Sequence, residues 1–307
     1  MKLTGLGIWT AQFDFQPAHV VRDTVQELED LGYHSLWVGE NVGREPISQA
    51  SILLAATQRM IVATAVANIW ARDPLSTHAA QQTLSEAYPG RFILGLGISH
   101  RRLVEQTRGL RYEKPLETMR DYLQAMDANA HTYRAVQANN VIRVAAALGP
   151  RMLQLAGTLT DGAHSYLVPA EHTALARHQL GPEKLLIPEQ AVVLETNKTR
   201  AYDIARQHIR RYLPLSNYTY NLRRLGFTDD DFDHHGSDRL VDALVAWGDE
   251  DRIAERINRH HQAGADHVCI NVLDPDPRAL PLPQWRRLAA ISMRRPANSA
   301  PPSRRDT

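Results

Sequence analysis

The sequence predicts an α/β protein whose strands close into a TIM-type (β/α)8 barrel, and three observations lead there. Eight short apolar runs, with the length and character of buried parallel strands, alternate with segments of helical periodicity along the 307 residues. Strand alternating with helix is typical of a parallel sheet, and eight such units favour a closed barrel. The first strand-to-helix turn, residues 9–17, lacks the glycine-rich fingerprint of an open dinucleotide-binding sheet.

Each expected element follows from local periodicity. The clearest helix covers Ala18–Leu31, where Val21, Val25 and Leu28 share one face and Gly32 follows as a stop signal. The other expected helices are Pro74–Tyr88, Leu116–Asp127, Pro150–Leu159 and Ile253–Ala263. The expected strands are Leu6–Trp9, Ser35–Val38, Met60–Ile69, Phe92–Leu96, Val141–Ala146, Ala163–Val168, Leu185–Leu194 and His267–Leu273.

One domain is expected over residues 1–293. The segment at about 214–235 is rich in Tyr, Asn, Arg and Asp and departs from the strand–helix pattern. It is expected to be an insertion before the last strand, where long insertions tend to shape a substrate site. Residues 294–307 are rich in Pro, Ser and Arg, carry no apolar period, and are expected to be a disordered tail.

Bulk composition narrows the class of partner. The net charge is +1 with 22% charged residues, so neither nucleic acid nor a membrane surface is an expected partner. No apolar run approaches transmembrane length, and the first residues lack the layout of a signal peptide. The single Cys269 lies in an apolar run and is expected to be buried and inert, which fits a cytoplasmic protein.

The most informative stretch follows the expected strand Phe92–Leu96. Gly97 permits close approach of a ligand to the backbone, and Ser99 and His100 add a hydroxyl and an imidazole. Barrels of this class place their chemistry at the carboxyl ends of the strands, so these residues are candidates for the site. The plainer interpretation is a strand end followed by the polar start of a helix.

The other strand ends supply aromatic and amide groups: Trp9, Glu40, Asn41, Asn68 and Tyr166. No cluster of His and carboxylates suited to a metal is expected, and the adjacent histidines at 234–235 and 260–261 are expected on solvated faces. No nucleophile elbow occurs either. Such a lining suits a cofactor that carries its own chemistry.

Gly149, Pro150 and Arg151 lie where the fifth strand passes into a helix. Backbone N–H groups at a helix N-terminus with one cationic side chain nearby would form a phosphate cradle. An ordinary helix start with a surface arginine is the equal alternative from the sequence alone.

Five segments together carry a family resemblance. They are LEDLGYHSLWV at 28–38, NIWARDP at 68–74, YPGRFILGLG at 88–97, GPRML at 149–153 with TDG at 160–162, and AGADHV at 263–268. Their order and spacing resemble the luciferase-like flavin and deazaflavin oxidoreductases, particularly the actinobacterial branch that is assigned coenzyme F420.

The resemblance implies a bacterial luciferase-like TIM barrel with the cofactor ring in its mouth, and a non-proline cis peptide near Thr64–Ala65 behind the ring. It also implies a homodimer through helices that include Ile52–Ala56 and Thr77–Leu84. The residues expected to bind the cofactor, coenzyme F420 or alternatively FMN, are Thr64, Ala65, Asn68, Gly97, Ser99, Gly149, Pro150 and Arg151. Those expected to face the small-molecule substrate are Trp9, Asn41 and Tyr166.

One departure affects the expected chemistry. Sugar-phosphate dehydrogenases of this family end the second strand with Asp-His, whereas this chain has Glu40 and Asn41, and Asn41 cannot take up a proton at neutral pH. The proton-handling role is therefore expected at His100, with Glu40 second. The expected reaction is hydride transfer, in particular reduction of an activated C=C or C=N bond. An FMN-dependent monooxygenase and a non-catalytic flavin-binding barrel remain the alternatives.

Overall fold

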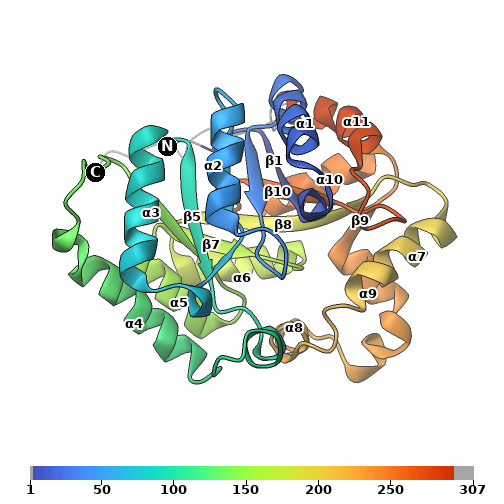
Figure 1. Cartoon of the computed structure of the whole chain (residues 1–307). Helices are drawn as coiled ribbons and strands as arrows, with labels where there is room; N and C mark the ends of the chain where they lie inside the picture. The colour runs from blue at the N-terminus through green and yellow to red at the C-terminus, as the bar shows by residue number, and fades with distance from the viewer. Residues whose placement is uncertain (1–2, 294–307) are drawn as a thin grey trace, which may run out of the picture.

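Eight parallel strands close into a barrel in the computed structural model, which describes residues 3–293 (Figure 1). Every strand pair is parallel, and pairing of the last barrel strand with the first, residue 268 beside residue 6, completes the ring. The predicted TIM barrel is therefore confirmed. The barrel strands are β1 Leu6–Thr10, β2 Ser35–Val38, β3 Ile61–Thr64, β5 Phe92–Gly97, β6 Ile142–Ala146, β7 Gly162–Ser165, β8 Leu185–Val193 and β10 Val268–Val272.

Two short strands supplement the barrel. The expected third strand, Met60–Ile69, is divided into β3 and β4 (Ala67–Asn68), and both pair with β5. The chain between them contains a cis peptide bond from Ala65 to Val66, one residue beyond the expected position. β9 (Val245–Trp247) extends the sheet beside β8 and did not figure in the sequence-based expectation.

Helices cover the outside of the barrel, and local sequence accounts for where they begin. α2, α3, α4 and α5 each have proline in the first turn, where its missing N–H costs no hydrogen bond. Side-chain caps also mark helix starts, for example Asp73 on α3 and Asp249 on α10. The helices are α1 Ala18–Asp30, α2 Pro46–Ala56, α3 Pro74–Ala87, α4 Pro115–Ala128, α5 Pro150–Leu159, α6 Ala170–Leu180, α7 Lys198–Ile209, α8 Ser216–Arg224, α9 Asp238–Leu244, α10 Glu250–Gln262 and α11 Leu282–Met293.

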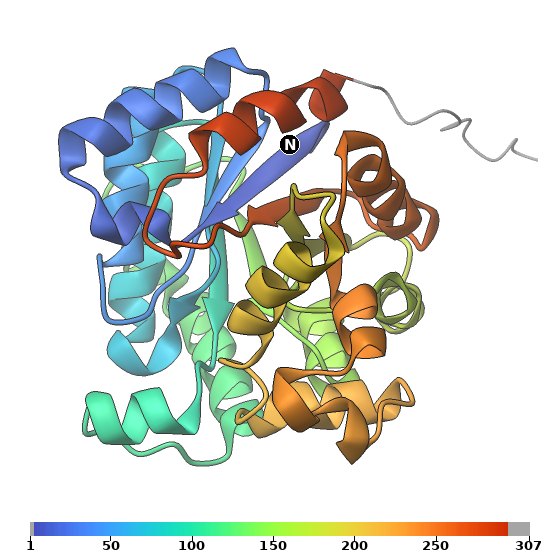
Figure 2. The ribbon, with the colours of Figure 1, turned by 90° about the vertical axis from the view of Figure 1, so that its right-hand side faces the viewer.

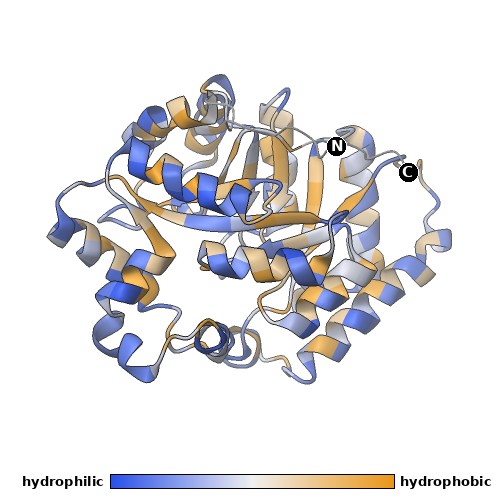
Figure 3. Ribbon diagram, turned by 180° about the vertical axis from the view of Figure 1, so that it is seen from behind, coloured by the Kyte–Doolittle hydropathy of each residue, from blue (hydrophilic) through white to orange (hydrophobic). Residues whose placement is uncertain are grey.

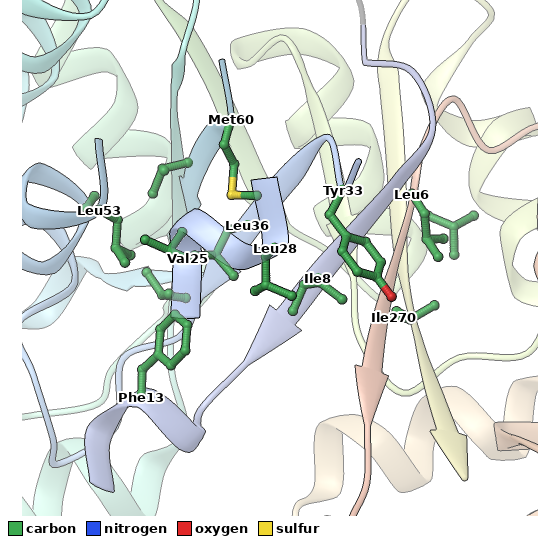
Figure 4. Packing of buried hydrophobic residues seen from close by; sticks show 14 of the residues in the cluster. Leu6, Ile8, Phe13, Val25, Leu28, Tyr33, Leu36, Leu53, Met60 and Ile270 are labelled. Atoms are coloured by element: carbon green, nitrogen blue, oxygen red, sulfur yellow. The ribbon is translucent and has the colours of Figure 1, made fainter. Parts of the chain in front are cut away.

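The core has two layers that sequence periodicity explains. Between helix and barrel, α1 lays Val25 and Leu28 over Ile8 and Leu36 of the barrel wall (Figure 4). Hydropathy shows the same division, since many of the outer helices carry hydrophilic stretches while the strands are largely hydrophobic (Figure 3). Inside the barrel lies a separate cluster, which includes Trp37, Ala63, Ile93, Val144, Ile187 and Cys269. Cys269 is fully buried, as expected.

The segment around 214–235 forms α8 and two short 3-10 turns between α7 and α9, and α8 lies at the lower end of the barrel in two views (Figures 1 and 2). Asp231 ties this segment to α9, because its carboxylate accepts hydrogen bonds from Ser237 Oγ at 2.7 Å and from the Arg239 guanidinium. The Arg239 contact lowers the pKa of Asp231. The insertion is thereby held over the mouth instead of swinging freely.

One surface expectation was wrong. His260 on α10 is fully buried, with Nδ1 2.8 Å from Thr173 Oγ1 and Nε2 3.0 Å from Gln190 Oε1. It lies on the face of α10 that packs on the barrel, and two side-chain partners satisfy both ring nitrogens. Its neighbour His261 is only half-buried, so the pair divides between core and surface. The predicted tail, 294–307, lies outside the described residues.

Candidate functional site

A cavity of about 1040 Å³ opens at the carboxyl ends of the strands, and residues of α7 and α8 also line it. Most of the side chains expected from the sequence line it. Those that do are Trp9, Glu40, Asn41, Ala65, Asn68, Gly97, Ser99, His100, Gly149 and Tyr166. Thr64, Pro150 and Arg151 are not among its lining residues.

Thr64 supports the cavity wall from within the sheet. Its hydroxyl donates to Gly95 O at 2.7 Å and accepts from Gly95 N at 2.9 Å, which joins β3 to β5 where their direct pairing ends. Gly97 lies two residues further along β5, against Val66. A Cβ at Gly97 would overlap the Val66 side chain. The apolar wall made by Ala65, Val66 and Gly97 is therefore flat and close to the backbone.

Glu40 is fully engaged by hydrogen-bond donors. Its Oε2 accepts from Asn68 N and from Arg72 Nη1, each at 2.7 Å, and its Oε1 accepts from Arg108 Nη2 at 2.7 Å. The carboxylate is 5% exposed. A buried carboxylate with two guanidinium partners is held in place, and both of its oxygens already accept hydrogen bonds, so Glu40 positions Asn68.

His100 faces the cavity from the end of β5, half-buried, with its ring 5.7 Å from the ring of Tyr218 on the insertion. Burial lowers its pKa below the ordinary histidine value, and the side chain of Asn217 partly offsets this. The preceding Ser99 has φ of 53°, which turns the chain sharply at the strand end. Burial of the ring therefore favours the neutral imidazole of His100.

Two further histidines line the cavity that the sequence did not place there, His164 and His208. Burial lowers the pKa of His164 to about 4 and that of His208 to about 3. His164 stacks on Trp37 and bonds to Ile187 O, so it is part of the barrel packing. Both imidazoles stay neutral at physiological pH, and His100 is the one of the three that is least buried.

The start of α5 gains its cation from a distant part of the chain. Arg224 at the end of α8 lines the cavity, and its Nη1 would lie 3.2 Å from a Cβ placed on Gly149. Arg151, which the sequence suggested for this role, is exposed and lies outside the cavity lining. The N-terminus of α5 and the Arg224 guanidinium thus face one corner of the cavity together. Arg102, Arg211 and Arg278 are the other guanidinium groups along the cavity.

Aromatic side chains form the floor. The rings of Trp9 and Tyr166 lie 5.0 Å apart, and Trp9 Nε1 donates to Ala65 O at 3.2 Å. Tyr166 Oη is 2.8 Å from Tyr212 Oη and accepts from Asn271 Nδ2 at 3.1 Å. Asn271 was missed because it lies on β10, and only closure of the barrel brings it to Tyr166.

Residues 3–293 hold no group of three or more His, Cys, Asp or Glu arranged to bind a metal. Within the same range, no helix has the length and apolar character needed to cross a bilayer.

The sequence model of the luciferase-like monooxygenase family matches residues 5–267, which is most of the chain. Among curated proteins, one from Mycobacterium tuberculosis assigned as a coenzyme F420-dependent oxidoreductase is 34% identical over 118 residues, 38% of this chain and 33% of that protein. The 5,10-methylenetetrahydromethanopterin reductase of Methanolobus tindarius is 28% identical over 160 residues, 47% of this chain and 48% of the reductase. Each alignment spans less than half of the relative's own length.

Solved structures share the fold over nearly the whole chain. An F420-dependent secondary alcohol dehydrogenase in complex with an F420-acetone adduct has a TM-score of 0.76 at 14% identity, covering 96% of this chain and 100% of that chain. The F420-dependent tetrahydromethanopterin reductase of Methanopyrus kandleri has a TM-score of 0.75 at 15% identity, covering 93% and 96%. A Baeyer–Villiger monooxygenase of Pseudomonas putida in complex with FMN has a TM-score of 0.69 at 14% identity, covering 95% and 97%.

Proposed function

The chain belongs to the luciferase-like monooxygenase family, and on that premise we propose that it is an oxidoreductase dependent on coenzyme F420. The proposed reaction is hydride transfer to a small organic substrate, in particular reduction of an activated C=C or C=N bond. The names of the relatives with a similar sequence support the choice of cofactor. The observation that carries the proposal is a cavity with a flat apolar wall, a helix N-terminus with a guanidinium at one corner, and a half-buried imidazole.

The described residues fit this cofactor. A deazaflavin has a flat ring and an anionic phosphate tail, and bound here it would supply the hydride. Ala65, Val66 and Gly97 would hold the ring, because their close backbone leaves a smooth surface. Asn68 and Ser99 add polar groups at the edge of that wall. Gly149 with the first turn of α5, together with Arg224, would hold the phosphate.

His100 is the proposed proton donor. An imidazole nitrogen at the end of β5 can pick up a proton from solvent and pass it to the substrate atom beside the carbon that is reduced. Glu40 holds Asn68 and the adjoining backbone in place through its three hydrogen bonds. Trp9, Asn41 and Tyr166 are the proposed substrate contacts. The proposed location is the cytoplasm, which fits the single buried thiol.

FMN is the alternative cofactor, because the Pseudomonas putida monooxygenase with the same fold holds FMN and the phosphate corner would suit either molecule. Calorimetric titration of the purified protein with each cofactor decides between them. We expect micromolar affinity for coenzyme F420 and weak or no binding of NADP. Tighter binding of FMN together with oxygen consumption would favour the monooxygenase. Failure to bind F420 or FMN would contradict both, and would also exclude a flavin-binding barrel without catalysis.

A further inference from the structure

Five polar side chains meet on the floor of the cavity, and we refer to them as the floor cluster: Tyr166, His208, Tyr212, Asn271 and Glu189. They come from β7 and its end, α7 and its end, β10 and β8. The first four line the cavity, and Glu189 lies directly below them with 1% of its surface exposed. Of the five, only Tyr166 has a part in the proposed function, as a substrate contact.

One hydroxyl proton of the floor cluster has only a distant acceptor. Tyr166 and Tyr212 carry two hydroxyl protons, and the 2.8 Å bond between them uses one; with Tyr212 as the donor of that bond, the proton of Tyr166 is left over. Asn271 Nδ2 donates to Tyr166 Oη, so that oxygen is already an acceptor. The remaining proton has His208 Nε2 at 3.5 Å, the long limit of a hydrogen bond. A ligand with an acceptor atom would compete well for it.

Glu189 accounts for the orientation of Asn271. Glu189 Oε2 accepts from Leu167 N at 3.1 Å, and the Asn271 side chain lies close enough to affect its ionisation. Its Oε1 has no hydrogen-bond partner within residues 3–293, and none of the ion pairs found there includes it. Burial raises the pKa of Glu189 to about 7, although Leu167 N and Asn271 act in the opposite direction. An acceptor held below the amide keeps the Asn271 N–H groups pointing at Glu189 and Tyr166, not at the ligand.

We propose that Tyr166 donates a hydrogen bond to a carbonyl oxygen of the substrate, and that Glu189 is a positioning residue that holds Tyr166 in place through Asn271. This rests on the proposed function and names the substrate class: a C=C bond activated by conjugation to a carbonyl group. The hydrogen bond would draw electron density toward the oxygen and away from the conjugated carbon atoms. His100 and Tyr166 then serve different atoms of one substrate.

The chemistry of the cluster favours a carbonyl over a cationic iminium. An iminium nitrogen has no lone pair to accept the free hydroxyl proton. Glu189 is largely protonated below pH 7, so the floor carries no fixed negative charge to attract a cation there. The aromatic rings of Trp9 and Tyr212 are compatible with either ligand and do not decide the matter.

The test compares two probes that differ in one oxygen, cyclohex-2-enone and cyclohexene. Their affinities are measured by ligand-observed NMR with the cofactor-loaded protein and again without cofactor. Tyr166→Phe is expected to weaken enone binding about tenfold, the effect of one desolvated hydrogen bond, and to leave cyclohexene binding unchanged. Tyr202→Phe is the matched control, because Tyr202 is also buried but bonds to Asp242 away from the cavity.

Glu189 variants separate positioning from simple structural support. Glu189→Leu should lose the preference for the enone as Tyr166→Phe does, the double variant should lose no more, and Glu189→Gln should restore it. Equal enone affinity in the parent protein and Tyr166→Phe, or parallel losses for both probes, would overturn the proposal. The F420 titration is a separate measurement. If F420 fails to bind while the enone preference holds, the cofactor assignment fails and the floor cluster assignment stands.

Discussion

Desolvation without full burial sets the chemistry of His100. Its ring borders the cavity and Tyr218, so its pKa falls below the ordinary value without reaching the low values of His164 and His208. A proton donor for a reaction near neutral pH works best when its pKa lies near the working pH. Among the three cavity histidines, His100 comes closest to that condition.

Replacing His100 tests the role. His100→Ala should lower kcat by about 10²-fold or more, since general-acid help is worth roughly 10²–10⁴, while F420 affinity changes only a few fold. His178→Ala provides a control on the exposed surface of α6. Steady-state kinetics with any working substrate gives the answer, and near-normal turnover of His100→Ala would reduce the imidazole to a packing residue.

The pH dependence of kcat gives a second readout for the same residue. Because the folded pKa of His100 is lowered by burial, the protonated donor is a minor form at pH 7 and grows as the pH falls. The rate of reduction should therefore rise with falling pH through a region below about 6.5 and then level off. That limb should be missing in His100→Ala, and a limb that persists would assign it to another group.

The insertion contributes to the site at the scale of whole elements. α8 places Tyr218, Asn217 and Arg224 over strand ends that are distant from them in the sequence. The Asp231 hydrogen bonds hold the turns that follow α8 against α9. A cradle formed by α5 and α8 together would couple cofactor binding to the position of the insertion.

Arg224 tests that arrangement. Arg224→Gln should weaken F420 binding by roughly 1–2 kcal/mol, or about five- to thirtyfold, because it removes a charge-assisted contact at a solvent-exposed corner. Arg151→Gln is the matched control, an arginine on the same helix start that faces outward. Calorimetry at two salt concentrations should show a smaller salt dependence in Arg224→Gln. Equal losses of F420 affinity in both variants would mean that only the overall positive charge near the cavity matters, and not a contact of Arg224.

Strand positions were predictable because each depends on a short apolar run, and all eight expected barrel strands are present. The start of α5 was predictable for the same reason, since Gly149 and Pro150 act on their own backbone. The cation beside it was not, because Arg224 reaches Gly149 only through the fold of the insertion. Thr64 is a third case. It lies at the end of a barrel strand, as expected, but its hydroxyl bonds to Gly95 within the sheet and not toward the cavity.

Buried histidines dominate the pH response of the whole molecule. Burial lowers the pKa of His208, His260 and His267 to about 3 and that of His164 to about 4, whereas the unfolded chain titrates at about 6.5. Their contribution to stability is fully present above about pH 6.5 and is lost as the pH falls toward those values. Glu189 acts in the opposite direction, because burial raises its pKa to about 7.

The free energy of unfolding should therefore fall on acidification from pH 6.5 to 4.5 by on the order of 1 kcal/mol per histidine per pH unit. Urea unfolding at several pH values measures the slope. His260→Gln removes one titrating group and should make the slope shallower, whereas exposed His178→Gln should leave it unchanged. A stability that is flat across this range would show that the imidazoles are protonated in the folded protein.

A homodimer is proposed for the whole molecule, through α2 and α3. A shallow apolar groove lies there, lined in part by Ile47, Ile52, Ala80 and Leu84, and Ile52 is 36% exposed. Sedimentation should give twice the 34.5 kDa chain mass. Ile52→Arg should shift it to the monomer, and Leu175→Arg, at an exposed apolar side chain on α6, should not. A parent protein that sediments as a monomer at high concentration contradicts this.

Closure of the barrel by β1 against β10 also constrains how the chain is made. The outer edge of β1 is covered only when β10 pairs with it, residue 268 beside residue 6. The Gln12 side chain likewise gains its hydrogen bond to the carbonyl of Val272 only then. A nascent chain emerging from the ribosome therefore exposes the edge of β1 through almost the whole of translation. Slow, long-range pairing of this kind leaves an unpaired edge open to other chains. Yield in a cell should thus depend on translation speed and on chaperones that shield this strand.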